Sequence, residues 1–193
     1  MKSGVQLRFP TNYKSVESVS DLMNEFTFFG PSEMHSVIKG GFCISVFALI
    51  RRDNSYLLVR PASHPKWKEE WAPNWRLYSE DGIRRELESL RFPSSYIKEG
   101  EHPDATLARI LKDQLGLKTY SIGTSSLLNF YEPSRRYPGQ HHWDYCYIYH
   151  VQTEEMPSPS AWLSEANYVP ADKMDTAAFG SAQGTIAAVL QSA

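Results

Sequence analysis

The segment from Phe92 to Leu117, FPSSYIKEGEHPDATLARILKDQLGL, is the most informative part of this sequence. An acidic loop that includes Glu101 runs directly into a short amphipathic stretch, which begins at Pro103 and is followed by Gly116. Proline suits the first turn of a helix, and glycine suits the position just past its end. We therefore expect a loop, a helix from Pro103 to Leu115 and a second loop. We expect this helix to pack through Ala105, Leu107, Ala108, Leu111 and Leu115.

Apolar runs on both sides of this segment predict strands. The run Phe42–Ile50, a polar turn and the run Tyr56–Arg60 together predict a hairpin of two buried strands. The stretch Trp143–Val151 alternates with a period of two and is apolar on both faces, which is typical of a central strand. On that strand, Tyr145, Tyr147 and Tyr149 predict a packed sheet face. We also expect a strand over 125–131 and helices over 81–90 and 185–190.

Length and element order predict one domain with an appendage. A chain of 193 residues can bury a single sizeable core. Strands that precede, follow and flank an amphipathic helix favour an α+β fold built in layers. We expect residues 1–40 to form an N-terminal extension that packs on the domain, and residues 41–193 to form that domain.

Charge and cysteine content exclude several classes of protein. Twenty basic and 22 acidic residues give a net charge of -2, so no overall field attracts nucleic acid or anionic lipid. Cys43 and Cys146 lie in apolar runs without metal-site spacing, which predicts two reduced thiols. The N-terminus does not resemble a signal peptide, and the longest apolar run is too short to cross a membrane. We therefore expect a cytoplasmic protein without a membrane partner.

The segment from Phe92 to Leu117 resembles the Nudix box, the signature of the Nudix hydrolase superfamily. That signature reads Gly, five residues, Glu, seven residues, then Arg-Glu-apolar-x-Glu-Glu-x-Gly-apolar. Aligned on its last glycine, this chain places there Ser95, Glu101, Arg109, Ile110, Leu111, Asp113, Gln114, Gly116 and Leu117. The resemblance implies a Nudix-type α/β/α sandwich with a mixed β-sheet. It also implies that carboxylates hold Mg²⁺ or Mn²⁺ against the pyrophosphate of a nucleotide-like substrate.

This chain departs from the signature at the residues that the family uses for metal. The three helical glutamate positions hold Ile110, Asp113 and Gln114, while Glu101 remains in the loop. Because Mg²⁺ prefers anionic oxygens, we expect poor metal occupancy, with Glu101 and Asp113 as the remaining ligands. The same two residues and Gln114 are the candidate catalytic set. The resemblance also implies that Arg109 and Glu101 fix the loop to the helix.

The first and last glycine positions of the box differ in this chain: the first is changed and the last is kept. Ser95 stands in place of the first glycine, and because serine tolerates positive φ poorly, we expect the loop to have changed shape. Gly116 keeps its position at the end of the helix. Ser95, Arg109 and Gly116 are therefore interpreted as the structural residues of the box.

Two segments outside the box carry candidate ligand contacts. The loop EPSRRYPGQHHWD holds Arg135, Arg136, His141 and His142, which predict contact with a phosphate-bearing ligand. The alternative for this loop is a solvated hairpin connection. Trp67, Trp71 and Trp75 fall four residues apart, which favours packing in the core or at an interface, with base stacking as the alternative.

Two functions remain open from the sequence. In the first, the chain has a depleted metal site and binds a nucleotide or nucleoside-diphosphate-like ligand, with weak or lost hydrolysis. In the second, it is a Mg²⁺- or Mn²⁺-dependent hydrolase that cleaves a nucleoside diphosphate linked to another moiety. RNA, a protein partner and a second copy of the chain remain as further partners, and a purely structural α+β protein is the third alternative.

Overall fold

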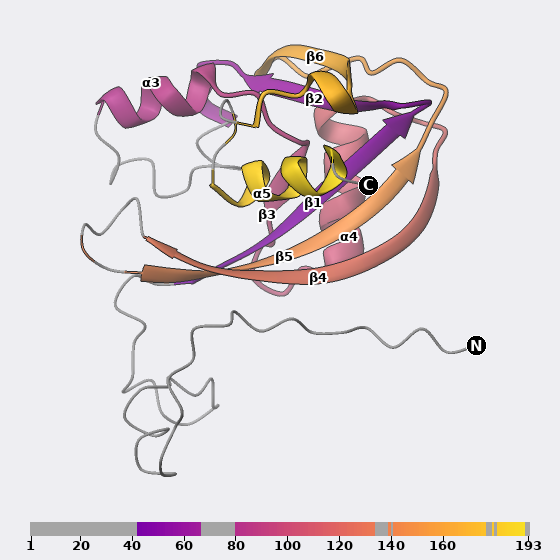
Figure 1. The fold of residues 1–193 in the computed structure, drawn as a ribbon. Helices are drawn as coiled ribbons and strands as arrows, with labels where there is room; N and C mark the ends of the chain where they lie inside the picture. Colours follow the sequence, from indigo (N-terminus) through magenta and orange to yellow (C-terminus); the bar gives the residue numbers. More distant parts are fainter. Residues whose placement is uncertain are drawn as a thin grey trace. The chain divides into compact units, whose positions relative to one another are not determined.

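The protein is built on one mixed sheet, shown as a ribbon in Figure 1. The computed structural model describes residues 42–66, 80–133, 139, 141–176, 179 and 181–191. The strands are β1 (Phe42–Arg52), β2 (Ser55–Pro61), β3 (Ser94–Tyr96), β4 (Ser121–Pro133), β5 (His141–Gln152) and β6 (Leu163–Pro170). They follow the order β4-β5-β1-β2-β6, with β3 paired to β1. β1 and β5 run parallel, and the other pairs are antiparallel.

The predicted hairpin forms, but its two strands soon separate. β1 and β2 pair only where Arg51 lies opposite Tyr56 and Arg52 opposite Ser55. The two-residue turn between them contains Asp53 with φ 53, a left-handed conformation that aspartate tolerates. Beyond the turn, β1 pairs with β5 and β3, whereas β2 pairs with β6. This separation places β3, the start of the box, beside the centre of the sheet.

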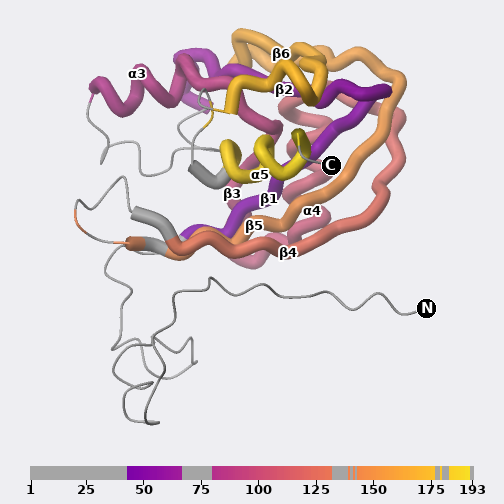
Figure 2. Tube along the Cα trace, in the orientation of Figure 1, coloured from indigo at the N-terminus to yellow at the C-terminus, as the bar shows by residue number. Residues whose placement is uncertain are grey.

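Helices cover both faces of the sheet. The helical elements are α3 (Glu80–Glu88), α4 (Pro103–Arg109), the π-helical turn η2 (Ile110–Gln114), the 3₁₀ turn η3 (Ala171–Lys173) and α5 (Ser181–Gln191). Figure 2 traces the same path in sequence colours, with α4 and α5 separated by the strands. None of the helices in the described part of the chain is long and apolar enough to span a membrane.

Two cores follow from the alternation of side chains along the strands. Val46, Ala48 and Ile50 of β1 belong to a first cluster, core 1. It is covered by Leu107 of α4, Ile110 and Leu111 of η2, and Leu115 directly after η2. Odd-numbered residues of β1, Phe47 and Leu49, join core 2, which α5 covers with Ile186 and Ala187. The result is the expected α+β sandwich with a mixed sheet, and the prediction of β5 as a central strand is confirmed.

Other sequence predictions are met in part. The strand expected over 125–131 extends from Ser121 to Pro133, and the helix expected over 81–90 ends at Glu88. Neither Cys43 nor Cys146 forms a disulfide, and Cys43 is only half-buried. Residues 1–40 and the tryptophans at 67, 71 and 75 lie outside the described residues. The domain bounds and the roles of those tryptophans therefore stay predictions.

Candidate functional site

A capped turn leads the acidic loop into α4. The imidazole Nδ1 of His102 accepts a hydrogen bond from the backbone N–H of Asp104 at 3.2 Å, and Pro103 occupies the first turn. The backbone N–H of Glu101 donates to the carbonyl of Lys98 at 2.9 Å. Gly100 has φ 74 in this turn, a conformation in which glycine is least strained. These local contacts turn the Glu101 side chain back toward the helix.

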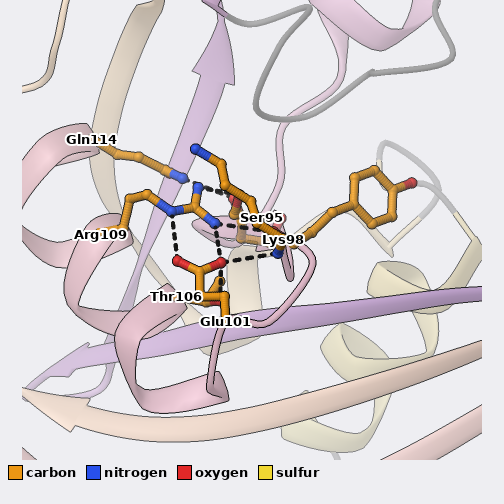
Figure 3. Close-up of polar contacts among 8 residues, drawn as sticks. Ser95, Lys98, Glu101, Thr106, Arg109 and Gln114 are labelled. Carbon is orange, nitrogen blue, oxygen red and sulfur yellow. Dashed lines mark hydrogen bonds and ion pairs between the residues drawn. The ribbon is translucent and has the colours of Figure 1, made fainter.

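Glu101 and Arg109 form a two-pronged ion pair between the loop and α4, drawn in Figure 3. The guanidinium Nε donates to Oε1 of Glu101 at 3.0 Å, and Nη2 donates to Oε2 at 2.8 Å. Oε2 also accepts from the Thr106 hydroxyl at 2.7 Å and from the Lys98 backbone N–H at 3.0 Å. Both carboxylate oxygens are therefore engaged by protein donors.

Arg109 also binds β3. Its Nη1 donates to Ser95 Oγ at 2.9 Å, and its Nη2 donates to the Tyr96 carbonyl at 3.0 Å. The guanidinium thus joins the loop, the helix and the sheet through one planar group. The structural role that the resemblance implied for the Arg109–Glu101 pair stays a prediction.

The electrostatics of this pair favour the ionised carboxylate. The hydrogen bonds from the Arg109 guanidinium lower the pKa of Glu101 to about 2, helped by the Lys98 backbone and the Thr106 hydroxyl. Partial burial acts in the opposite direction but is outweighed. Glu101 is therefore an anion at neutral pH whose charge is already compensated by Arg109.

The serines in place of the glycines lie in regular strand. Ser94 and Ser95 pair with Phe47 and Val46 as part of β3, and neither has positive φ. Both side chains are buried. Because the segment is extended, serine adopts it without backbone strain. The reason for expecting a changed loop shape, which was serine at positive φ, therefore does not apply here.

The packed side of the box helix differs from the predicted one. Ala105 is exposed and Ala108 is half-buried, so the prediction that both belong to the packed side is wrong for Ala105. The π-helical turn starts at Ile110 and widens the coil there, which changes the direction of the following side chains. The buried set is Thr106, Leu107, Ile110, Leu111, Gln114 and Leu115.

The three altered metal positions therefore face different surroundings. Ile110 is 0 % exposed within core 1, and Gln114 is 1 % exposed. The Gln114 amide Nε2 donates to the Ser94 carbonyl at 2.9 Å, while its Oε1 is buried and has no hydrogen-bond partner among the described residues. Asp113 is exposed to solvent.

The residues at the metal positions of the box offer few ligands to a divalent cation. A cation at this helix would have an alkyl group at 110, a buried amide held by Ser94 at 114, and a carboxylate already bound by arginine at 101. Asp113 alone offers an exposed, unpaired carboxylate among these positions. No cluster of three metal-binding side chains occurs anywhere in the described ranges. One carboxylate is the lower end of what Mg²⁺ sites use, and such sites also draw on water and substrate phosphates.

The end of the helix is fixed by the segment that follows β5. The backbone N–H groups of Ser158 and Ser160 each donate at 2.8 Å, to the carbonyls of Leu115 and Gln114 respectively. Gly116 has φ 65, and a Cβ there would lie 2.8 Å from the Ser158 carbonyl oxygen. Glycine is thus required at Gly116 both for its conformation and for this close approach.

The predicted ligand loop is described only in part. His141 is exposed at the start of β5, and its ring stacks on Tyr131. Arg135, Arg136 and the side chain of His142 lie outside the described residues. Ligand contact by these four residues stays a prediction.

Sequence reasoning missed two polar contacts of the box. Thr106 is completely buried and holds Glu101, although threonine in a helix gives no sequence signal for this role. The Tyr149 hydroxyl donates to Oδ1 of Asp104 at 2.5 Å, and burial raises the pKa of Tyr149. This hydrogen bond joins β5 to the first turn of α4, across 45 residues of sequence.

The family follows from comparison with known proteins. The chain matches the family model for the NUDIX domain over residues 41–188, which covers most of its 193 residues. The chain belongs to the Nudix family. A search of the curated proteins finds no match.

Several solved structures share the fold. A MutT protein from Methanosarcina mazei Go1 is 16% identical over 78% of this chain and 94% of its own, with a TM-score of 0.54. A bifunctional NMN adenylyltransferase/ADP ribose pyrophosphatase from Francisella tularensis is 10% identical over 90% of this chain and 44% of its own, with a TM-score of 0.53. A UDP-X diphosphatase is 11% identical over 84% of this chain and 66% of its own, with a TM-score of 0.51.

Proposed function

We propose that this chain is a Nudix-fold protein that binds a nucleotide-like ligand and has weak or no hydrolytic activity. The observation that carries the proposal is the burial of Ile110 and Gln114, which occupy two of the three helical carboxylate positions of the box. Neither side chain can supply an anionic oxygen. Fold alone does not fix function, so the proposal depends on this site.

The remaining carboxylates support the same conclusion. Glu101 would have to exchange strong hydrogen bonds with Arg109 for bonds to a metal, and Arg109 would then be left without its anion. Asp113 is a single exposed carboxylate. A single carboxylate binds only weakly the cation that would neutralise a pyrophosphate and activate water at neutral pH.

The ligand class rests on the family and on one solved relative. A further structure of the Francisella tularensis protein, at a TM-score of 0.52, is a complex with AMP and a manganese ion. We extend the nucleotide, though not the metal, to this chain. Arg135, Arg136, His141 and His142 are the proposed contacts to its phosphates.

The test combines turnover and binding. Purified protein is incubated with Mg²⁺ or Mn²⁺ and a panel that includes ADP-ribose, a UDP-linked sugar and nucleoside triphosphates, and phosphate or nucleotide release is followed. We expect no release above a no-protein blank, together with a rise in melting temperature when a nucleotide is added without metal.

Two variants make the result decisive. If the panel is hydrolysed and both Asp113→Ala and Glu101→Gln abolish that turnover, the hydrolase alternative replaces this proposal. If release in the wild type persists unchanged in both variants, Asp113 and Glu101 do not carry it. The proposal then stands only if a freshly purified sample shows no release. An absent thermal shift with every nucleotide tested would remove the binding half of the proposal.

A further inference from the structure

A row of aromatic rings crosses from β4 to β5 outside both cores. Tyr131 stacks on His141 with ring centroids 5.0 Å apart and planes 22° apart. Trp143 lies 4.9 Å from Tyr131 at an angle of 40°. Trp143 is also nearly parallel to Tyr145, at 6.1 Å and 25°. Four planar groups thus follow one another across two neighbouring strands.

Strand register places the row on one face of the sheet. Tyr131 pairs with Trp143 and Asn129 pairs with Tyr145, so these side chains point to the same side. Tyr149, four residues beyond Tyr145, is on that side too and packs in core 1 beneath the box helix. The aromatic row therefore lies on the box face of the sheet.

The side chains on this face of β5 become more exposed from Tyr149 back toward the start of the strand. Tyr149 is 7% exposed and Tyr147 packs against core 1, which agrees with the packed face expected from the sequence. Tyr145 belongs to neither core and is half-buried, as is Trp143. Tyr131, between His141 and Trp143, is 54% exposed. The expectation of a packed face thus fails at Tyr145.

The spacing of the rings suits a planar guest. A planar group held between two rings needs about 7 Å, which is two contacts of about 3.5 Å. The step from Trp143 to Tyr145 is the widest in the row and lies nearest to that span. A small outward rotation of either side chain would admit a third ring between them.

A hydrogen-bonding group stands beside this step. Asn129 lies opposite Tyr145 on the same face and is exposed. Within the described ranges, its amide makes no hydrogen bond. An amide offers both a donor and an acceptor, which matches the mixed polar edge of a nucleobase. An aliphatic ligand would fit this site less well than a nucleobase, because it has neither a flat face to stack on the rings nor a polar edge to bind Asn129.

We propose that this aromatic row binds a nucleobase, which stacks between Trp143 and Tyr145 while Asn129 hydrogen-bonds its edge. The proposal rests on the proposed function, since it names the part of the nucleotide that the protein holds. Base stacking on aromatic side chains does not depend on a metal, so it suits a box without metal ligands. The base is supplied either by a free nucleotide or by an unpaired base of single-stranded RNA.

The experiment measures binding of AMP and UMP to the full chain by calorimetry and by saturation-transfer NMR, with ribose 5-phosphate as the probe without a base. We expect the base protons to receive the strongest saturation and ribose 5-phosphate to bind at least tenfold more weakly. Trp143→Leu and Tyr145→Leu are each expected to weaken AMP binding about tenfold. Leu128→Ala, which changes an exposed side chain on the opposite face of β4, should leave the affinity unchanged.

The results that would overturn the stacking site differ from those that would overturn the proposed function. Equal affinity for AMP and ribose 5-phosphate, or unchanged affinity in Tyr145→Leu, overturns the stacking site even if no nucleotide is hydrolysed. Hydrolysis of the panel with base-dependent binding would instead remove the proposed function and keep the stacking site. If Trp143→Leu does not fold, the wild-type NMR pattern and Tyr145→Leu decide. A short single-stranded RNA that binds more tightly than AMP identifies RNA as the source of the base, and the reverse order identifies the free nucleotide.

Discussion

At the scale of single residues, Arg109 connects three parts of the protein with one side chain. It binds Glu101, Ser95 and the Tyr96 carbonyl, and its side chain is 13% exposed in the ion pair. We expect Arg109→Met to lower the free energy of unfolding by about 3 kcal/mol, because Glu101 is left partly buried without its partner. Urea denaturation measures the change.

A matched variant separates this effect from general loss of an arginine. Arg84 pairs with Asp81 on α3, where the two side chains are 67% and 72% exposed. Arg84→Met should lower the free energy of unfolding by less than about 1 kcal/mol, since exposed ion pairs contribute little. Similar losses in both variants would contradict the structural role of Arg109.

Acid should weaken the same ion pair. The pKa of Glu101 is about 2 in the folded protein, below the 4.5 of an ordinary glutamate. A lowered folded pKa stabilises the protein fully above the ordinary value, and that contribution is lost as pH falls from about 4.5 toward 2. Glu101→Gln should therefore be less stable than wild type at pH 7, with a gap that narrows below pH 4. A gap that is constant with pH would contradict this assignment.

Gln114 offers a second pH test with the opposite sign. In Gln114→Glu, a carboxylate replaces the amide that donates to the Ser94 carbonyl, inside a site that is 1 % exposed. Burial raises the pKa of such a carboxyl, and the protonated form can donate to Ser94 as the amide does. We expect a loss of stability that grows as pH rises from 5 to 8, measured by thermal melting. Gln114→Met is the control, whose loss should not vary over that range.

At the scale of secondary-structure elements, the end of the box helix depends on a close contact with a distant segment. Gly116→Ala would force a side chain into positive φ and place its Cβ 2.8 Å from the Ser158 carbonyl oxygen. We expect a loss of about 3 kcal/mol in the free energy of unfolding, from backbone strain and displacement of residues 158–160.

Gly100 provides the control for this prediction. It also has positive φ, at 74, but a Cβ there would meet no atom within 4 Å. Gly100→Ala should cost only the backbone strain, about 1 kcal/mol. If the two variants lose equal stability by urea denaturation, the contact with Ser158 contributes nothing.

At the scale of the whole molecule, one sheet carries two separate cores. Ile110 lies in core 1 and Ile186 in core 2, on opposite faces of the strands. Ile→Val at either position should cost about 1 kcal/mol. Because the side chains share no contacts in either core, we expect the double variant to lose the sum of the two single losses. Urea denaturation of all three variants tests this, and a coupling above about 0.5 kcal/mol would show that the sheet transmits strain between its faces.

Local sequence patterns were enough to predict the main helices and strands of this protein. Pro103, Gly116 and the apolar spacing between them define the box helix and its two loops, and period-two alternation defines β5, because capping and amphipathicity are written in neighbouring residues. The spacing of Glu101 and Arg109 also sufficed to relate the chain to its family. The altered residues at 110 and 114 could be read directly as a loss of carboxylates.

Which residues of the box helix are buried in the core depends on the tertiary structure. Ile110 and Gln114 are buried while Asp113 is exposed, because the π-helical turn, β3 and the segment 158–160 together set the direction of each side chain. The aromatic row likewise depends on the register of β4 against β5, which joins Tyr131 to Trp143 through pairing that no local pattern specifies. Burial and strand register depend on contacts between segments that are distant in the sequence. Local sequence patterns could therefore predict the helix and the strands, but not which of their side chains are buried.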